Sequence, residues 1–335
     1  MKSEYERPYR ALEHDRVSRR RLLLALPALI AAPRLLAQTP APPIRVRGLN
    51  HVTLSVSDVK RSVEFYQGLF GMPVVSRQGT AMNLRIGAGP QFLGVGAASD
   101  VPRIDHLCLG VDEFNVDRIT RTLAKYNVRT VDQNGTTEIY VRDPNGFVIQ
   151  LQDERYCGGT GALGNVCPAP EASRTRGLLA LRGWSHCTNT VSDPAASRTF
   201  CQDVFGLRIQ AYQGPTAPVL GIGGVQFLMF TAGGAGRGSS SAAPRASINH
   251  LCMTIENFRP EAVIKTLESY GITPRGDAQG APGPLVHYIS MRRADRGGAQ
   301  EGTPELYFTD PDGLPIQLQD VSYCGGAGVL GNVCI

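Results

Sequence analysis

The chain has 335 residues, of which 42% are hydrophobic and 19% charged, a balance typical of a soluble globular protein with about two domains. Its formal charge is +5, but eight of the 34 basic residues and four of the 29 acidic ones lie in positions 1–37. The remaining 26 basic and 25 acidic residues leave a net charge of +1, so the composition gives no indication of a nucleic-acid partner.

The first element in the chain, residues 1–37, is predicted to be an export signal. Arg19–Arg21 precede an apolar run, Leu22–Ala32, that is too short to span a bilayer, and the sequence LLAQ then offers a cleavage point. This pattern resembles a twin-arginine signal, which implies a protein that folds before export, often with its cofactor in place. We therefore expect a periplasmic or otherwise exported protein with no stable membrane insertion. The alternative, a basic anchor or uncleaved tether, is disfavoured because Pro27 and Pro33 break a long helix.

Four copies of one structural unit follow the signal. Each copy opens with a strand in which apolar and polar residues alternate; these strands are Asn50–Val56, Asp105–Val111, Ser185–Val191 and Asn249–Ile255. A helix is predicted after each strand; with their flanking caps the helices are Asp58–Gly71, Val116–Tyr126, Asp193–Gly206 and Pro260–Tyr270. Short strand-like runs complete each unit, so the predicted fold class is α+β with four βαβββ modules.

The modules are predicted to pair into two domains, at 48–153 and 183–320. Between the domains lie a Cys-containing loop and a linker with Pro and Ala, 154–182, and a second Cys loop forms the tail, 321–335. The fourth module alone carries an insertion, 285–303, which is predicted to form an extended hairpin.

The two Cys loops, YCGGTGALGNVC and YCGGAGVLGNVC, have the same spacing. An oxidising compartment would allow Cys157 to bond Cys167 and Cys324 to bond Cys334. A zinc site needs four ligands at short spacing and each loop has only two, so disulfides are the favoured interpretation.

Strand alternation places the polar residues of each module on one face of a sheet. Val52 and Leu54 must face the helix, which turns His51 to the opposite face. By the same alternation each domain collects two His, a Glu and a Tyr on the polar face, and the strand after the DPNG or DPDG turn adds a Gln. These residues are His51, His106, Glu138, Tyr140 and Gln150 in the first domain, and His186, His250, Glu305, Tyr307 and Gln317 in the second. If the sheets curve, the set forms a cup for a ligand; the alternative is a group of structural His residues copied by duplication.

At these positions the chain resembles the vicinal oxygen chelate superfamily, which includes glyoxalases, bleomycin-resistance proteins and extradiol dioxygenases. The resemblance covers Gly48–Asp320, and the four-module arrangement is similar to that of two-domain extradiol dioxygenases. In that family a His opens the first strand of each paired module, and a Glu lies four positions after the Gly of the turn. In the extradiol enzymes a Tyr lies ten positions before that Glu. Here Gln150 and Gln317 stand in place of the Glu, with Tyr140 and Tyr307 ten positions before them.

The resemblance implies a metal site in one or both domains. The implied ligand sets are His51, His106 and Gln150, and His186, His250 and Gln317, with Tyr140 or Tyr307 contacting a substrate oxygen. Gln can ligate through its carbonyl oxygen but brings no negative charge, so the attraction for a dication is weaker. Glu138 or Glu305 is the alternative source of a carboxylate.

The function implied by the resemblance is that of a metal-dependent enzyme similar to extradiol dioxygenases, acting on a small catechol-like or other vicinal-oxygen substrate. The divalent metal would be Fe(II) in a dioxygenase, and Zn, Mn or Ni otherwise. Two alternatives stay open: a non-catalytic small-ligand-binding protein like the bleomycin-resistance proteins, and a glyoxalase-type lyase or isomerase.

Overall fold

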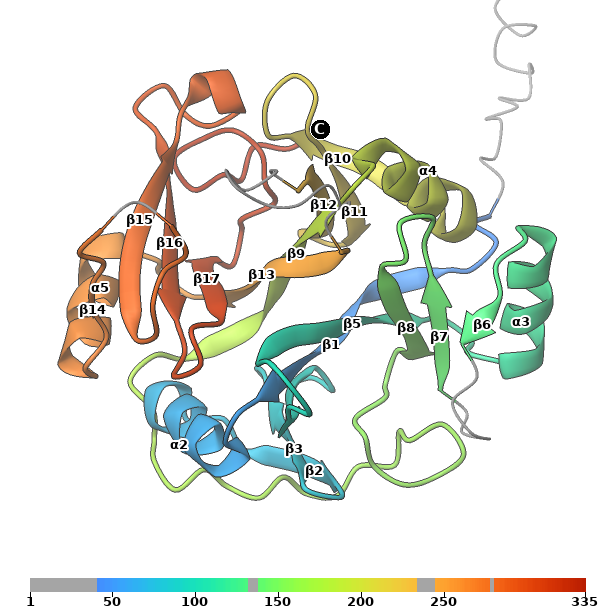
Figure 1. The fold of residues 1–335 in the computed structure, drawn as a ribbon, viewed down its shortest axis with the longest axis horizontal. Helices are drawn as coiled ribbons and strands as arrows, with labels where there is room; N and C mark the ends of the chain where they lie inside the picture. The colour runs from blue at the N-terminus through green and yellow to red at the C-terminus, as the bar shows by residue number, and fades with distance from the viewer. Residues whose placement is uncertain (1–40, 132–137, 234–244, 278–279) are drawn as a thin grey trace, which may run out of the picture. The chain divides into compact units, whose positions relative to one another are not determined.

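Two mixed β-sheets, one from each half of the chain, form the framework of the protein (Figure 1). The computed structural model describes residues 41–131, 138–233, 245–277 and 280–335, and residues 42–335 form one compact unit. The predicted export signal, 1–37, lies outside the described residues.

The first sheet has eight strands in the described residues, in the order β2-β3-β4-β1-β5-β8-β7-β6. Its half of the chain contains β1 (Val46–Val56), α2 (Val59–Phe70), β2 (Val74–Gln78), β3 (Ala81–Arg85), β4 (Phe92–Ala97), β5 (Arg103–Val111), α3 (Val116–Lys125), β6 (Thr130–Val131), β7 (Ile139–Arg142) and β8 (Val148–Asp153). The opening strands of the two modules, β1 and β5, run antiparallel at the centre, and each pairs in parallel with the last strand of its own module.

The second sheet repeats this plan with nine strands in the described residues, in the order β10-β11-β12-β9-β13-β17-β16-β15-β14. Its elements are β9 (Leu181–Val191), α4 (Pro194–Phe205), β10 (Arg208–Tyr212), β11 (Pro218–Gly223), β12 (Gln226–Ala232), β13 (Ser247–Ile255), α5 (Pro260–Ser269), β14 (Thr273–Pro274), β15 (Val286–Arg292), the 3₁₀ turn η1 (Ala294–Arg296), β16 (Thr303–Thr309) and β17 (Pro315–Asp320). The predicted α+β fold of repeated strand–helix–strand modules is confirmed. The insertion of the fourth module forms the predicted hairpin, because β15 pairs antiparallel with β16.

The helices begin and end where the sequence predicts. In α2 the side chain of Asp58 accepts a hydrogen bond from the backbone N–H of Arg61, and the helix stops at Gly71, whose φ of +66° is left-handed. The equivalent helix α4 is capped by Asp193 and ends at Gly206 with φ +65°. Matching caps in α2 and α4 indicate that the first and third modules fold by the same local rules.

The two DPxG turns join the halves to each other. Asp143 of the first turn accepts a hydrogen bond from the Ser197 hydroxyl of α4. Asp310 of the second turn accepts one from the Tyr66 hydroxyl of α2, at 3.1 Å. Apolar residues from both sheets pack into one continuous core beside these contacts. Each turn therefore binds the first helix of the opposite half.

The linker, which is part of 154–182, contacts the first half of the chain. Glu171 forms an isolated bridge with Val74 and an ion pair with Arg77, at 2.6 Å. In the part of the chain that the structure describes, every helix is too short or too polar to cross a membrane.

Candidate functional site

One row of residues crosses five neighbouring strands of the first sheet. His51 of β1 pairs with Phe92 of β4 on one side and with Cys108 of β5 on the other. Cys108 pairs with Gln150 of β8, and Gln150 pairs with Tyr140 of β7. Sheet register therefore brings together residues that lie up to about a hundred positions apart in the chain.

The second sheet contains the same row. Its members are Phe227, His186, Cys252, Gln317 and Tyr307. Where β6 of the first sheet places Val131 beside Tyr140, β15 of the second sheet places Tyr288 beside Tyr307. The second His of each half, His106 or His250, stands two residues before the Cys of the row, so strand alternation turns it to the same face. We call His51, His106, Gln150 and Tyr140 the first cup, and His186, His250, Gln317 and Tyr307 the second cup.

In the first cup both imidazoles converge on the amide of Gln150. The Nε2 atoms of His51 and His106 lie 2.9 and 3.0 Å from Oε1 of Gln150. The His51 ring stacks on Phe92 with ring centres 4.4 Å apart, and the edge of His106 meets Tyr140 at 5.4 Å. The aromatic neighbours hold both rings with Nε2 pointing at the Gln.

The second cup has a similar arrangement with one difference. The Nε2 atoms of His186 and His250 lie 3.3 Å from each other, and Gln317 lies beside both rings with its amide nitrogen buried and without a partner among the described residues. His186 stacks on Phe227 at 4.3 Å, and His250 meets Tyr307 at 5.2 Å. The structure thus brings together the predicted His, Gln and Tyr residues in both halves.

The contact at Nδ1 of His51 determines which ring nitrogen carries the proton. Nδ1 of His51 lies 2.8 Å from Oδ1 of Asn50, and the Asn50 amide nitrogen donates to the Tyr156 carbonyl at 2.8 Å. Because the amide oxygen must then face the ring, Nδ1 carries the proton. Burial, and then the neighbouring His106, lowers the pKa of His51, so the ring is neutral. Its Nε2 is left with a lone pair that points at Gln150.

The other three rings also have a polar partner on Nδ1. These are Asp105 Oδ2 for His106, Ser185 Oγ for His186 and Asn249 Oδ1 for His250, at 2.8, 3.0 and 2.9 Å. Burial lowers the pKa of His186 and brings the pKa of His250 to about 4, so both rings of the second cup are neutral. Such Nδ1 partners orient metal-binding His residues in proteins.

The donor set fits a divalent metal. Two imidazole nitrogens and one amide oxygen meet at about 3 Å in the first cup, and lone pairs on these atoms repel unless a cation lies among them or the amide turns its NH₂ toward the rings. Within the described residues, no group of three or more His, Cys, Asp or Glu side chains could hold a metal ion. A metal in either cup would therefore depend on the Gln oxygen.

The two Glu residues predicted as alternative carboxylates are directed at Tyr hydroxyls. Glu138 accepts from Tyr140 (3.4 Å) and Tyr156 (3.3 Å), and Glu305 accepts from Tyr307 (3.5 Å) and Tyr323 (3.1 Å). Burial is the main reason that the pKa of each of these Tyr residues is raised, and the nearby Glu adds to it. The hydroxyls therefore keep their protons and can donate hydrogen bonds.

The sequence prediction missed Tyr156 and Tyr323. Each ring lies 5.6 Å from the first His of its cup. Gln78 donates to the Tyr156 hydroxyl at 2.8 Å, and Gln213 donates to the Tyr323 hydroxyl at 3.3 Å. A signal for this role was present in the sequence, because a Tyr stands directly before the first Cys of both loops.

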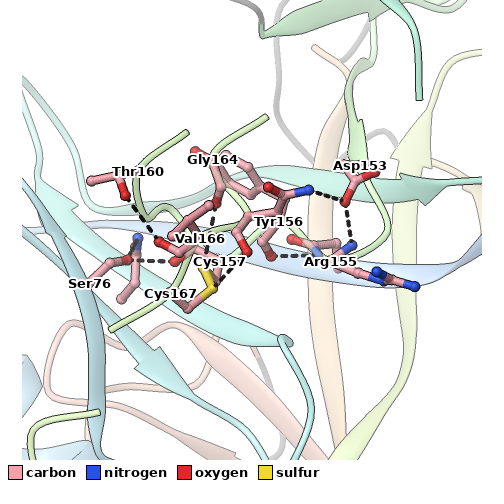
Figure 2. Close-up of a disulfide and its surroundings, with 12 residues drawn as sticks. Ser76, Asp153, Arg155, Tyr156, Cys157, Thr160, Gly164, Val166 and Cys167 are labelled. Carbon is pink, nitrogen blue, oxygen red and sulfur yellow. Dashed lines mark hydrogen bonds between the residues drawn. A yellow bond between two sulfur atoms is a disulfide. The ribbon is translucent and has the colours of Figure 1, made fainter. Parts of the chain in front are cut away.

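A disulfide loop holds each of these Tyr residues in place. Figure 2 shows the first loop, where Cys157 is bonded to Cys167 and its backbone N–H donates to the Gly164 carbonyl. A Cβ on Gly164 would lie 2.5 Å from the Tyr156 ring, so only Gly allows the loop to close on the Tyr. The second loop repeats these contacts with Cys324, Cys334, Gly331 and Tyr323. Both predicted disulfides are present in the structure.

The second cup opens into a pocket with a volume of about 320 Å³. Its lining includes the buried side chains of His186, His250 and Gln317. The insertion of the fourth module adds Tyr288, Ser290 and Arg296 to the walls. The pocket is large enough for a small-molecule ligand beside the His residues.

Comparison with known proteins identifies the family of this fold and site. Residues 48–151 match the family model described as the Glyoxalase/Bleomycin resistance protein/Dioxygenase superfamily. Residues 48–151 therefore form a domain of this superfamily, as the resemblance implied, and the second half of the chain repeats the same strand and helix plan.

Relatives of known sequence cover the first third of the chain. The metallothiol transferase FosB of Lysinibacillus sphaericus is 26% identical over 117 residues, which are 32% of this chain and 82% of that protein. FosB of Shouchella clausii is 28% identical over 120 residues, which are 32% of this chain and 80% of that protein. The names of these relatives describe metal-dependent enzymes.

Solved structures match the paired arrangement of the modules. The 2,3-dioxygenase LapB of Pseudomonas sp. KL28 has a TM-score of 0.59 at 16% identity, covering 82% of this chain and 92% of its own. The Mn(II)-bound glyoxalase of Novosphingobium aromaticivorans has a TM-score of 0.56 at 15% identity, covering 82% of each chain. At these identities the likeness establishes the fold alone.

Proposed function

We propose that the protein is an exported, metal-dependent enzyme that acts on a small vicinal-oxygen substrate such as a catechol, in the manner of extradiol dioxygenases, in its second half. The observation that supports this most directly is that two neutral imidazoles and the Gln317 side chain meet in the lining of one pocket. The second cup is favoured over the first because that pocket gives a substrate access to the His residues.

The metal would be held by Nε2 of His186, Nε2 of His250 and Oε1 of Gln317. When bound, a divalent metal accepts two adjacent substrate oxygens and leaves room for a third ligand such as dioxygen. Fe(II) is the metal proposed for a dioxygenase, and Zn, Mn or Ni for other chemistry. A Gln ligand leaves one more positive charge on the site than a Glu would, which favours an anionic substrate oxygen.

Two Tyr residues of this chain would position the substrate. Tyr307 lies against the edge of His250 and keeps its hydroxyl proton, so it can donate a hydrogen bond to a substrate oxygen. Tyr323 donates to Glu305, which also accepts from Tyr307. Because a hydroxyl has one proton, Tyr307 would give up its 3.5 Å contact with Glu305 when it donates to the substrate.

Export is supported by the twin-arginine-like segment Arg19–Arg21 and by the two disulfides, which are typical of oxidising compartments. A cofactor-containing enzyme that folds before export would need its metal inserted in the cytoplasm.

A second candidate function is a metal-free cup that binds a small ligand. It is supported by the Gln side chain itself, because an amide NH₂ has two protons and can donate one to each imidazole Nε2. In that arrangement each imidazole Nε2 has a hydrogen-bond donor without a cation.

Metal binding separates the two candidates. Purified mature protein is incubated anaerobically with Fe(II), free ion is removed, and bound metal is counted. We expect stoichiometric metal that His250→Ala removes from the second cup, and a tighter site in Gln317→Glu because one negative charge is restored. The matched variants His106→Ala and Gln150→Glu report on the first cup. Absence of bound metal, with no gain from Gln317→Glu, would leave the metal-free cup as the better account.

The reaction class is tested on the same loaded protein. Extradiol cleavage takes up one dioxygen per catechol, with both oxygen atoms entering the ring-opened product, so oxygen uptake and product absorbance should rise together. A protein that binds metal but consumes no oxygen with catechols would instead point to lyase or isomerase chemistry.

A further inference from the structure

The second pocket contains one carboxylate, and a buried Arg neutralises it. Glu305 is 4% exposed, and Arg292 Nε lies 2.7 Å from its Oε1. The Arg292 side chain is fully buried and also donates to the carbonyls of Gly297 and Gly326, at 2.8 and 3.0 Å. This ion pair is fixed in the wall, so it leaves no net charge toward a ligand.

The remaining charged side chain on the pocket wall is Arg296. It belongs to the 3₁₀ turn η1 at the end of the inserted strand and is exposed. In the ranges that the structure describes, no ion pair or side-chain hydrogen bond engages its guanidinium. Its neighbours Arg293 and Asp295 are also exposed, but neither of them lines the pocket. Arg296 is therefore free to bind an anion that enters the pocket.

Two stacked Tyr rings stand in the pocket lining next to Gln317. Tyr307 lies next to Gln317 in the row of the second cup, and Tyr288 lies next to Tyr307 with the two rings stacked 5.1 Å apart at an angle of 9°. Tyr288 and Arg296 both come from the insertion, whereas Tyr307 and Gln317 belong to the repeated module. The segment 285–303 thus places an aromatic ring where the first sheet has Val131, and it contributes one cation to the pocket lining.

From this arrangement we infer that the second pocket selects a small aromatic substrate that bears vicinal oxygens at one end and a carboxylate at the other. The His and Gln end would face the vicinal oxygens, the Tyr wall would lie along the ring, and Arg296 would bind the carboxylate. This inference rests on the proposed function and names the substrate class of the same site. The preference for an acid belongs to the second half alone, since the fourth module is the one that carries the insertion.

A pair of matched probes tests the charge preference. The probes are 3,4-dihydroxybenzoate and 4-methylcatechol, which differ by a carboxylate in place of a methyl group. Binding to the full mature protein, loaded with divalent metal, is measured by calorimetry at low and high salt. We expect the acid to bind roughly tenfold or more tightly than the methyl compound at low salt, and less so at high salt.

Two substitutions then test whether Arg296 causes the preference for the acid. Arg296→Gln should abolish the preference for the acid while leaving 4-methylcatechol binding unchanged, and Arg293→Gln, an exposed neighbour outside the pocket, should leave both unchanged. The folded state of each variant is checked by the fluorescence of Trp184, the single Trp. Equal binding of both probes to the parent protein, or a preference that survives Arg296→Gln, overturns the inference. If 4-methylcatechol itself fails to bind, the proposed function fails as well, so the two failures are distinguishable.

Discussion

Raising the pH is expected to lower the stability of the protein through Asp310, a buried carboxyl group at the contact between the two halves. This carboxyl group is fully buried in the second DPxG turn and accepts the hydroxyl of Tyr66 at 3.1 Å. It also accepts the backbone N–H groups of Asp312 and Leu314, each at 2.9 Å. Burial is the largest cause of its raised pKa, which lies at about 6 against an ordinary value of 3.8, although these hydrogen bonds oppose the rise.

The direction of the effect follows from the raised pKa. A carboxyl whose pKa is higher in the folded state binds its proton more tightly there, so folding is favoured when it is protonated. Its contribution is fully present below the unfolded pKa and is lost as the pH rises through the folded value. The difference corresponds to about 3 kcal/mol in all, with most of the loss between about pH 4 and pH 7.

The variant Asp310→Asn isolates this contribution. Asn cannot ionise, its oxygen can still accept from both backbone N–H groups, and its NH₂ can donate to the Tyr66 hydroxyl. The free energy of unfolding is measured by urea denaturation, followed by the fluorescence of Trp184, which is 2% exposed. Between about pH 5 and pH 7.5 the parent protein should lose about 1.4 kcal/mol relative to the variant.

The matching turn of the first half provides the control. Asp143 accepts the backbone N–H groups of Asn145 and Phe147, each at 2.8 Å, so Asp143→Asn controls for placing an amide in a DPxG turn. Stability curves of parent and Asp310→Asn that stay parallel over this pH range would refute the reasoning.

Two further predictions concern the disulfide loops and the export of the protein. Replacing Cys324 and Cys334 with Ser should lower the free energy of unfolding by about 2 to 3 kcal/mol, because a 10-residue loop is no longer closed in the unfolded chain. Urea denaturation without reductant measures this, and an unchanged midpoint would contradict it. Replacing Arg19 and Arg20 with Lys should retain the protein in the cytoplasm of a bacterial host, as judged by cell fractionation. Normal export of that variant would rule out the twin-arginine signal.

Local signals in the sequence were sufficient for the elements of the fold. Asp58 and Gly71 mark the ends of α2 because a cap and a left-handed residue act within one turn of chain. The alternation in β1 turns His51 away from the helix for the same local reason. Because the module is repeated four times in the sequence, a prediction made for one module could be applied to the other three.

Contacts between distant residues could not be derived in this way. The hydrogen bond of Asp310 to Tyr66 joins positions 244 apart, and nothing in either stretch encodes the other. The DPxG turn was predicted to lead into a strand, yet its Asp also binds the opposite half. The same limit applies to Glu305, whose partner Arg292 depends on the register between β15 and β16. Strand alternation gives the face of a residue but not its neighbour on the next strand.

The two cups keep the same row of residues and differ in the charges around it. In the first cup Nδ1 of His106 is paired with the carboxylate of Asp105, whose pKa is lowered mainly by this hydrogen bond, and Arg103 lies 2.6 Å from the same side chain. In the second cup the equivalent partner of His250 is the neutral Asn249. A carboxylate behind a His strengthens it as a metal ligand, which would compensate for the neutral Gln, but Arg103 offsets much of that charge. Neither cup therefore regains the negative charge that a Glu ligand would supply. A cation in the second cup would depend on an anionic substrate to balance it, which is the kind of ligand that Arg296 also favours.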